Sequence, residues 1–253
     1  MPDAIFADPR LAPLYDAFDP DRSDLDHYLA MAQEFGARRV IDVGCGTGTF
    51  ACLLSGRGVE VIGVDPAGAS LDVARTKPGA DRVRWVLGDS SAVTSLGADL
   101  VTMTGNVGQV FLEDAHFARV LRDLASGVRE DGHVVFEVRD PARKAWESWT
   151  RAATWRRAEV AGLGAVISWV DVVEVALPLV TFRWTFEFER SGEVLTSEST
   201  LRFRSREEIE RAVTHSGLVV DSVRDAPDRP GLEFVFVCSR PRSGWGIHHD
   251  LGG

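Results

Sequence analysis

The chain has 253 residues, of which 45% are hydrophobic and 26% charged, as in ordinary globular proteins. It has no apolar run of the roughly eighteen residues that a membrane span needs, and its start, MPDAIFADPR, lacks a secretory signal pattern. A net charge of −10 without a basic stripe disfavours a nucleic-acid partner. We therefore expect a cytoplasmic protein with neither a membrane nor a nucleic-acid partner.

The first 140 residues alternate between helical and strand patterns. Ser23 and Asp26 predict a capping box for an amphipathic helix that ends at Gly36. Apolar strand patterns follow at 40–43, 59–65, 83–89, 98–105 and 133–140, with helical patterns at 49–58, 69–77 and 113–128. Pro66 suits the first turn of the second of these helices. Strands that alternate with helices predict a parallel sheet covered on both faces.

The pattern changes after residue 155. Residues 181–190 alternate strictly between aromatic and polar side chains, which predicts a half-buried antiparallel strand with neighbours at 165–177 and 193–204. A helix at 206–217 and two strands at 218–226 and 232–240 follow. The chain thus divides into a helical cap (1–35), a Rossmann-like core (36–150), an antiparallel insert (151–204), a closing helix and strands (205–241), and a tail (242–253) that we expect to be frayed.

A glycine-rich loop follows the first strand of the predicted sheet. Asp42, Gly44, Gly46 and Gly48 form D-x-G-x-G-x-G, and glycines allow both a sharp turn and close approach of a ligand. Ligands of open α/β sheets bind at the carboxyl ends of the strands. A dinucleotide fingerprint would place its third small residue at position 49, which is Thr49 here. The spacing therefore favours a different nucleoside ligand.

Two further acids end strands on the same edge. Asp65 ends the second strand, where an acid can accept hydrogen bonds from ribose hydroxyls, a feature that dinucleotide sites share. Asp89 or Ser90, after the third strand, could meet an adenine edge, and the alternative for Asp89 is a helix N-cap. The three cysteines form no C-x-x-C pair and the six histidines are scattered, so we expect no metal site.

The segments VIDVGCGTG, VIGVDPAGASLDVAR, WVLGDSS and ADLVTMTGN together resemble class I S-adenosylmethionine-dependent methyltransferases over residues 36–140. The resemblance implies an α/β fold, a Rossmann-like seven-stranded methyltransferase sheet whose antiparallel end is formed by the last two strands, with a small antiparallel β-sheet inserted. It implies S-adenosyl-L-methionine as the cofactor. The residues that we expect to bind it are Asp42, Gly44, Cys45, Gly46, Gly48, Asp65, Pro66, Asp89, Ser90, Thr104 and Gly105.

The same resemblance suggests candidates for the catalytic site. Asn106 closes the fourth strand beside the expected methyl donor, and Tyr15 resembles an amino-terminal aromatic residue that covers the cofactor in many members, with surface packing as its alternative. Groups at the ends of strands four and five that could take a proton are Asn106, Glu137, Arg139 and Asp140. We select Asn106, Arg139 and Tyr15 as catalytic candidates. Alternatively, Glu137 faces a helix and Arg139 pairs with Asp140.

The antiparallel insert resembles the one in small-molecule N-methyltransferases, where it shapes the acceptor pocket and often supports dimers. We therefore expect a small-molecule acceptor, with N-methylation ahead of O-methylation and a homodimer left open. Trp146, Trp149 and Trp155 either pack the insert onto the core or line that pocket. The alternatives are a nicotinamide-dependent oxidoreductase, disfavoured by Thr49, and a non-catalytic S-adenosylmethionine-binding protein.

Overall fold

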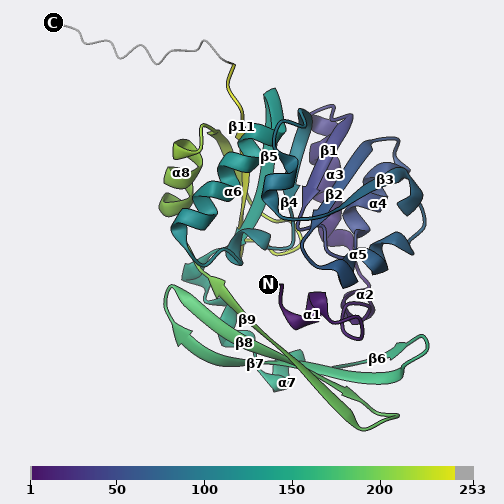
Figure 1. Cartoon of the computed structure of the whole chain (residues 1–253). Helices are drawn as coiled ribbons and strands as arrows, with labels where there is room; N and C mark the ends of the chain where they lie inside the picture. Colours follow the sequence, from purple (N-terminus) through teal and green to yellow (C-terminus); the bar gives the residue numbers. More distant parts are fainter. Residues whose placement is uncertain (1, 243–253) are drawn as a thin grey trace, which may run out of the picture.

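The computed structural model describes residues 2–242, so that all of the predicted tail except Arg242 lies outside the described residues. Within this range seven strands form a mixed sheet in the order β3-β2-β1-β4-β5-β11-β10 (Figure 1). They are β1 (Arg39–Val43), β2 (Glu60–Asp65), β3 (Val83–Leu87), β4 (Ala98–Met103), β5 (Val128–Arg139), β10 (Val219–Arg224) and β11 (Glu233–Ser239). The first five are mutually parallel, and β11 pairs antiparallel with both β5 and β10. The predicted sheet and its antiparallel end are confirmed.

Both faces of this sheet are buried. Successive residues of one strand enter opposite cores: Val40 packs with α3 and α4, whereas Ile41 packs with α6 and α8, as the alternation of side chains along a strand requires. The core helices are α3 (Asp26–Glu34), α4 (Thr49–Gly56), α5 (Gly68–Arg75), α6 (Asp114–Gly127) and α8 (Arg206–His215). Among the described residues, no helix combines the length and the apolar character needed to span a bilayer.

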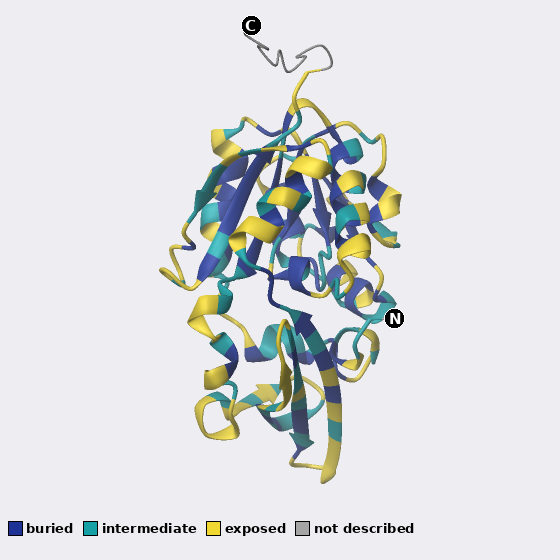
Figure 2. Cartoon of the chain, turned by 90° about the vertical axis from the view of Figure 1, so that its left-hand side faces the viewer, coloured by how far each residue is buried: buried dark blue, intermediate teal, exposed yellow. Residues whose placement is uncertain are grey.

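The insert forms a second sheet with the order β6-β7-β8-β9 and only antiparallel pairs. Its strands are β6 (Arg156–Val160), β7 (Gly164–Ala176), β8 (Leu179–Phe188) and β9 (Glu193–Arg202). Figure 2 shows it as a separate layer beneath the covered sheet. The sequence predicted β7, β8 and β9 but not β6, because Arg-Arg-Ala-Glu-Val has little hydrophobic alternation of its own.

Two short helices at the amino terminus, α1 (Ala4–Ala7) and α2 (Leu14–Phe18), lie between the two sheets (Figure 1). The Ile5 N–H donates to Ser197 Oγ of β9 at 2.9 Å, while Ser70 Oγ of α5 donates to the Phe6 carbonyl at 3.0 Å. The first residues of the chain therefore connect the insert to the core.

Several short elements complete the connections. They are α7 (Arg151–Thr154) and the 3₁₀ helices η1 (Ser23–Leu25), η2 (Ala80–Arg82), η3 (Ser90–Val93), η4 (Val107–Gln109), η5 (Pro141–Arg143) and η6 (Ala145–Ser148).

Two local predictions are wrong. The helix α3 starts at Asp26 after a 3₁₀ turn, with Leu25 at its N-cap and no side-chain cap, so Ser23 forms no capping box. Pro66 lies in the bend before α5 and not in its first turn, because the Asp65 carboxylate accepts the Ala67 N–H at 2.7 Å and the helix begins only at Gly68.

A capping box does exist at the start of α8, where Ser205 Oγ accepts the Glu208 N–H and Glu208 accepts the Ser205 N–H. We expect Ser205→Ala to lower the free energy of unfolding by about 1 kcal/mol, because it leaves a helix N–H unpaired. Ser23→Ala, which removes no cap, should change it by less than about 0.5 kcal/mol. Denaturant unfolding of both variants checks this, and equal losses would contradict the assignment.

Candidate active site

The glycine loop between β1 and α4 has a left-handed backbone at three positions, with φ of 72° at Gly44, 52° at Gly46 and 75° at Gly48. A Cβ at Gly44 would lie 2.7 Å from Val107, and one at Gly48 would lie 2.4 Å from Trp85. A Cβ at Gly46 would meet no described atom within 4 Å. Gly44 and Gly48 therefore allow close packing, whereas Gly46 is where the loop leaves room for a ligand.

The loop uses its own N–H groups to hold its shape. The N–H groups of Gly44 and Cys45 donate to the Val64 carbonyl at 2.8 and 3.2 Å. The Gly46 N–H donates to Asp65 Oδ2 at 2.8 Å, and the Gly48 N–H donates to the Cys45 carbonyl at 2.8 Å. A phosphate-binding loop instead points such N–H groups at the anion. This loop therefore offers a ligand space, but few donors for a pyrophosphate.

Two buried carboxyl groups lie beside the loop. Asp42 accepts a hydrogen bond from Thr102 Oγ1 at 3.0 Å, and its burial raises its pKa to about 7, with repulsion from Asp65 adding to the effect. Burial also raises the pKa of Asp65, while its bonds from the Ala67 and Gly46 N–H groups oppose this rise. Such a pair favours a cationic ligand and disfavours a dinucleotide pyrophosphate.

The third strand ends in residues that already have partners. Asp89 accepts the Ser91 N–H at 3.0 Å and the Ser91 hydroxyl at 2.6 Å, so its interpretation as an N-cap, here of η3, is confirmed. The Ser90 hydroxyl donates to Asp123 Oδ2 at 2.6 Å. Contacts of Asp89 or Ser90 with an adenine stay predictions.

A carboxylate also holds the loop that follows β4. Gly105 and Asn106 both have positive φ, 70° and 62°. Their N–H groups donate to Glu137 Oε1 at 2.7 and 3.2 Å, and the Tyr28 hydroxyl donates to Glu137 Oε2. Burial and the nearby Glu233 raise the pKa of Glu137. Glu137 thus positions the loop, and each of its oxygens accepts at least one hydrogen bond.

A polar cluster continues from Asn106 along the same edge of the sheet. Asn106 Nδ2 and Arg229 Nη1 each donate to Glu233 Oε1 at 3.0 Å. Arg139 Nη1 donates to Gln109 Oε1 at 3.0 Å, and Arg139 Nε lies 3.8 Å from Glu233 Oε1. The candidates Asn106 and Arg139 therefore meet through Glu233, a residue that the sequence interpretation missed.

The amino-terminal helix α2 is tied to the glycine loop. Asp16 accepts the Thr47 hydroxyl at 2.7 Å and pairs with Lys77 Nζ at 2.7 Å. This connection places Tyr15 near the guanidinium groups of Arg22 and Arg139, and burial raises the pKa of Tyr15. The ring of Tyr15 packs on Phe6 with centroids 5.9 Å apart.

The insert contacts this edge through Trp149. Its ring lies 4.8 Å from that of Phe182 on β8, and the Arg139 guanidinium lies 5.6 Å from the Trp149 centroid. Trp149 therefore both packs the insert and faces the polar cluster, whereas Trp155 is 48% exposed. The alternative pairing of Arg139 with Asp140 is wrong, because Asp140 caps η5 and pairs with Arg143.

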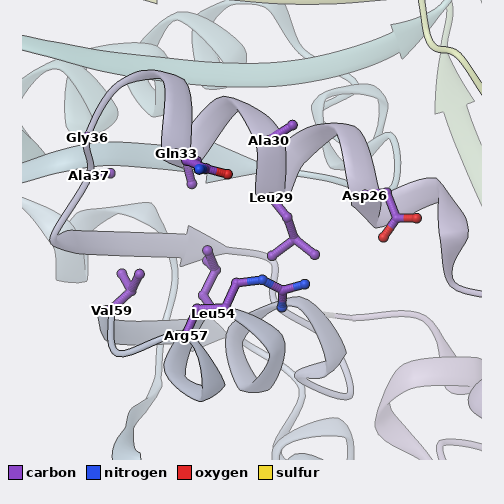
Figure 3. Close-up of a pocket in the computed structure, with 10 residues that line it drawn as sticks. Asp26, Leu29, Ala30, Gln33, Gly36, Ala37, Leu54, Arg57 and Val59 are labelled. Atoms are coloured by element: carbon purple, nitrogen blue, oxygen red, sulfur yellow. The ribbon is translucent and has the colours of Figure 1, made fainter.

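A separate hollow of about 660 Å³ lies between α3 and α4 (Figure 3). Its lining includes Leu29, Gln33, Leu54 and Arg57. It shares no residue with the glycine loop or the polar cluster, so we assign the site to the carboxyl edge of the sheet.

Comparison with known proteins agrees with this geometry. The family described as "Methyltransferase domain" matches residues 17–223. A cypemycin N-terminal methyltransferase from Streptomyces sp is 33% identical over 116 residues, 46% of this chain and 47% of the relative, so the chain spans about half the length of the curated relatives it matches.

Two solved structures have a similar fold. An S-adenosylmethionine-dependent methyltransferase from Clostridium acetobutylicum ATCC 824 has a TM-score of 0.73 at 15% identity, covering 92% of this chain and 98% of the other. An amino pentose methyltransferase from Micromonospora echinaspora, solved with S-adenosylmethionine bound, has a TM-score of 0.67 at 21% identity, covering 90% and 96%.

The chain therefore belongs to the methyltransferase domain family. Its fold is that of solved S-adenosylmethionine-dependent methyltransferases, the fold that the sequence resemblance predicted.

The raised pKa of Asp42 predicts a specific pH dependence of stability. Between pH 4 and about 7 the folded protein keeps a proton on Asp42 that the unfolded chain has lost, so this residue makes folding less favourable as pH rises, by up to about 1.4 kcal/mol per unit. Subtracting the unfolding free energy of Asp42→Asn from that of the wild type should therefore give a difference that falls from pH 5 to pH 7.

Asp99→Asn is the control. Hydrogen bonds from Arg129, Arg39 and Arg38 lower the pKa of Asp99 despite partial burial, so Asp99 is ionised in the folded and the unfolded state from pH 5 to pH 7. The difference in unfolding free energy between the wild type and Asp99→Asn should therefore not change with pH. A flat difference for Asp42 as well would contradict the assignment.

Proposed function

We propose that the chain transfers the methyl group of S-adenosylmethionine to an amine nitrogen of a small molecule. The observation that carries this proposal is the position of the acidic glycine loop, which suits a cationic nucleoside, beside the polar cluster of Asn106, Arg139 and Glu233. The family match supports methyl transfer. An amine acceptor is supported by the relative named for an N-terminal group and by the amino pentose enzyme.

The site's own residues fit the cofactor. Gly46 leaves open space, and each Asp65 oxygen, after accepting one backbone N–H, retains capacity for a ribose hydroxyl. The buried carboxyl group of Asp42 has a pKa raised to about 7, and a cation bound near the loop favours its ionised form. The other residues that we propose for this surface are Gly44, Cys45, Gly48, Pro66, Asp89, Ser90, Thr104 and Gly105. Bound S-adenosylmethionine supplies a methyl group on a positively charged sulfur.

Transfer by in-line displacement depends on alignment in a site that excludes water. Glu137 fixes Gly105 and Asn106, and the pairing of Asp16 with Thr47 holds α2 with Tyr15 near the edge. Burial lowers the pKa of Arg139 from a value so high that the guanidinium stays protonated, and burial raises the pKa of Tyr15. These two candidates therefore act as hydrogen-bond donors that orient the acceptor, and not as bases.

The proposal is tested by incubating the purified chain with S-adenosylmethionine and panels of small amines, small alcohols, peptides and RNA. We expect S-adenosylhomocysteine release with amines. Methylation of alcohols, peptides or RNA with no small amine methylated would overturn the proposed acceptor class. Binding of S-adenosylhomocysteine without any turnover would favour a non-catalytic binding protein.

Asp65→Asn tests the cofactor site directly. The amide replaces one accepting oxygen with a donor that cannot accept the Gly46 N–H or a ribose hydroxyl, so we expect affinity for S-adenosylhomocysteine to fall by about 1–3 kcal/mol. Asp72→Asn on the exposed side of α5, where Asp72 pairs with Arg75, is the control. Calorimetric titration measures both, and equal affinities for the two variants would remove Asp65 from the site.

A further inference from the structure

The polar cluster contains three buried atoms without a hydrogen-bond partner among the described residues. They are Asn106 Oδ1, Gln109 Nε2 and Glu233 Oε2. Asn106, Gln109 and Glu233 are only 3%, 1% and 3% exposed, and leaving such buried polar groups unpaired is unfavourable. Three such atoms in one cluster therefore remain available to hydrogen-bond a polar molecule.

The charged neighbours fix which atom of each amide is unpaired. Asn106 must direct Nδ2 at the Glu233 carboxylate, which leaves Oδ1 as an unused acceptor. Gln109 must direct Oε1 at the Arg139 guanidinium, which leaves Nε2 as an unused donor. Reversing either amide would place like groups against each other. The cluster thus presents two acceptors and one donor.

The cluster also lies where an acceptor molecule would be needed. Val107, next to Asn106, packs against Gly44 of the glycine loop. On the other side, Arg139 is 23% exposed at its side chain and faces Trp149, which packs on the insert. The cluster therefore lies between the cofactor loop and the insert.

We propose that this cluster is a subsite for an amine that carries an oxygen on a neighbouring carbon, either a hydroxyl or a carboxylate. Asn106 Oδ1 and Glu233 Oε2 accept from the amine N–H groups, and Gln109 Nε2 donates to the oxygen, with Arg139 beside it. This inference rests on the proposed function and narrows it: a simple amine satisfies only the two acceptors and leaves Gln109 Nε2 unpaired.

The wild-type protein tests this with four probes on one ring. They are trans-2-aminocyclohexanol, 1-aminocyclohexanecarboxylate, cyclohexylamine and cyclohexanol. Binding is measured by calorimetry in the presence of S-adenosylhomocysteine, and turnover by S-adenosylhomocysteine release. We expect at least one oxygenated amine to bind roughly tenfold or more tightly than cyclohexylamine, because only an oxygenated amine pairs the buried donor Gln109 Nε2. Whether the aminocyclohexanol or the aminocyclohexanecarboxylate binds more tightly shows whether the subsite prefers a hydroxyl or a carboxylate.

Two substitutions test the acceptor for the amine and the donor for the neighbouring oxygen separately. Glu233→Gln can keep an oxygen for Asn106 and Arg229 but turns the free acceptor into a donor, so every amine probe should lose roughly tenfold in affinity. Gln109→Glu keeps an oxygen for Arg139 but turns the free donor into an acceptor, so only the oxygenated amines should lose affinity. Glu60→Gln and Gln33→Glu, both away from the site, are the matched controls.

The outcomes separate this inference from the proposed function. Turnover of amines at equal efficiency with and without the neighbouring oxygen, unchanged by Gln109→Glu, would overturn the subsite and leave amine methylation standing. A wild-type protein that binds S-adenosylhomocysteine but neither binds nor methylates any amine would contradict both. The affinity of each variant for S-adenosylhomocysteine and its thermal unfolding measure whether the cofactor site and the fold are intact.

Discussion

The hydrogen bond from the Gly46 N–H to Asp65 is the contact on which the site depends. It fixes the left-handed loop after β1 against the end of β2, and the other oxygen of the same carboxylate holds the Ala67 N–H at the approach to α5. One side chain thus connects a loop, a strand and a helix at the carboxyl edge. Because the N–H is used internally, the loop presents space and negative charge, which suit a sulfonium nucleoside better than a pyrophosphate.

The loop after β4 is built in the same way. A carboxylate on the adjacent strand, Glu137 of β5, accepts the N–H groups of Gly105 and Asn106, both in left-handed backbone. In both loops a buried acid provides the hydrogen bonds that strained backbone would otherwise lose. These hydrogen bonds hold both loops in place without a ligand, which lowers the ordering cost of binding. Catalysis by placement depends on groups that are held in this way.

Much of this could be predicted from the sequence, because the relevant signals are local. The strand, glycine turn and helix around Asp42, and the acid that ends the next strand, are contiguous patterns, and the alternation of 181–190 marks the insert. Glu233 gave one weak signal, a lone acid at the start of an apolar strand. Gln109 gave none, since its importance comes from Arg139, 30 residues away in the chain.

The errors had either a local or a tertiary origin. Ser23 has the right residue type for a cap, but a 3₁₀ turn shifts the helix start to Asp26. Arg139 and Asp140 are adjacent in sequence, yet Arg139 lies against Glu233, opposite it on β11, and Asp140 turns to η5. The strand β6 forms because β7 offers it a pairing edge. For Arg139 and for β6, a tertiary partner decided what the local pattern could not.

The central claim is that the glycine loop at the carboxyl edge binds the cofactor. Backbone amide NMR of the purified chain during titration with S-adenosylhomocysteine tests it most directly. The account predicts saturable, equimolar shifts centred on Gly44, Gly46 and Gly105, with little change at Ala30 and Gly36, which line the hollow between α3 and α4. Shifts centred on that hollow, or equal shifts with NADH, would contradict it.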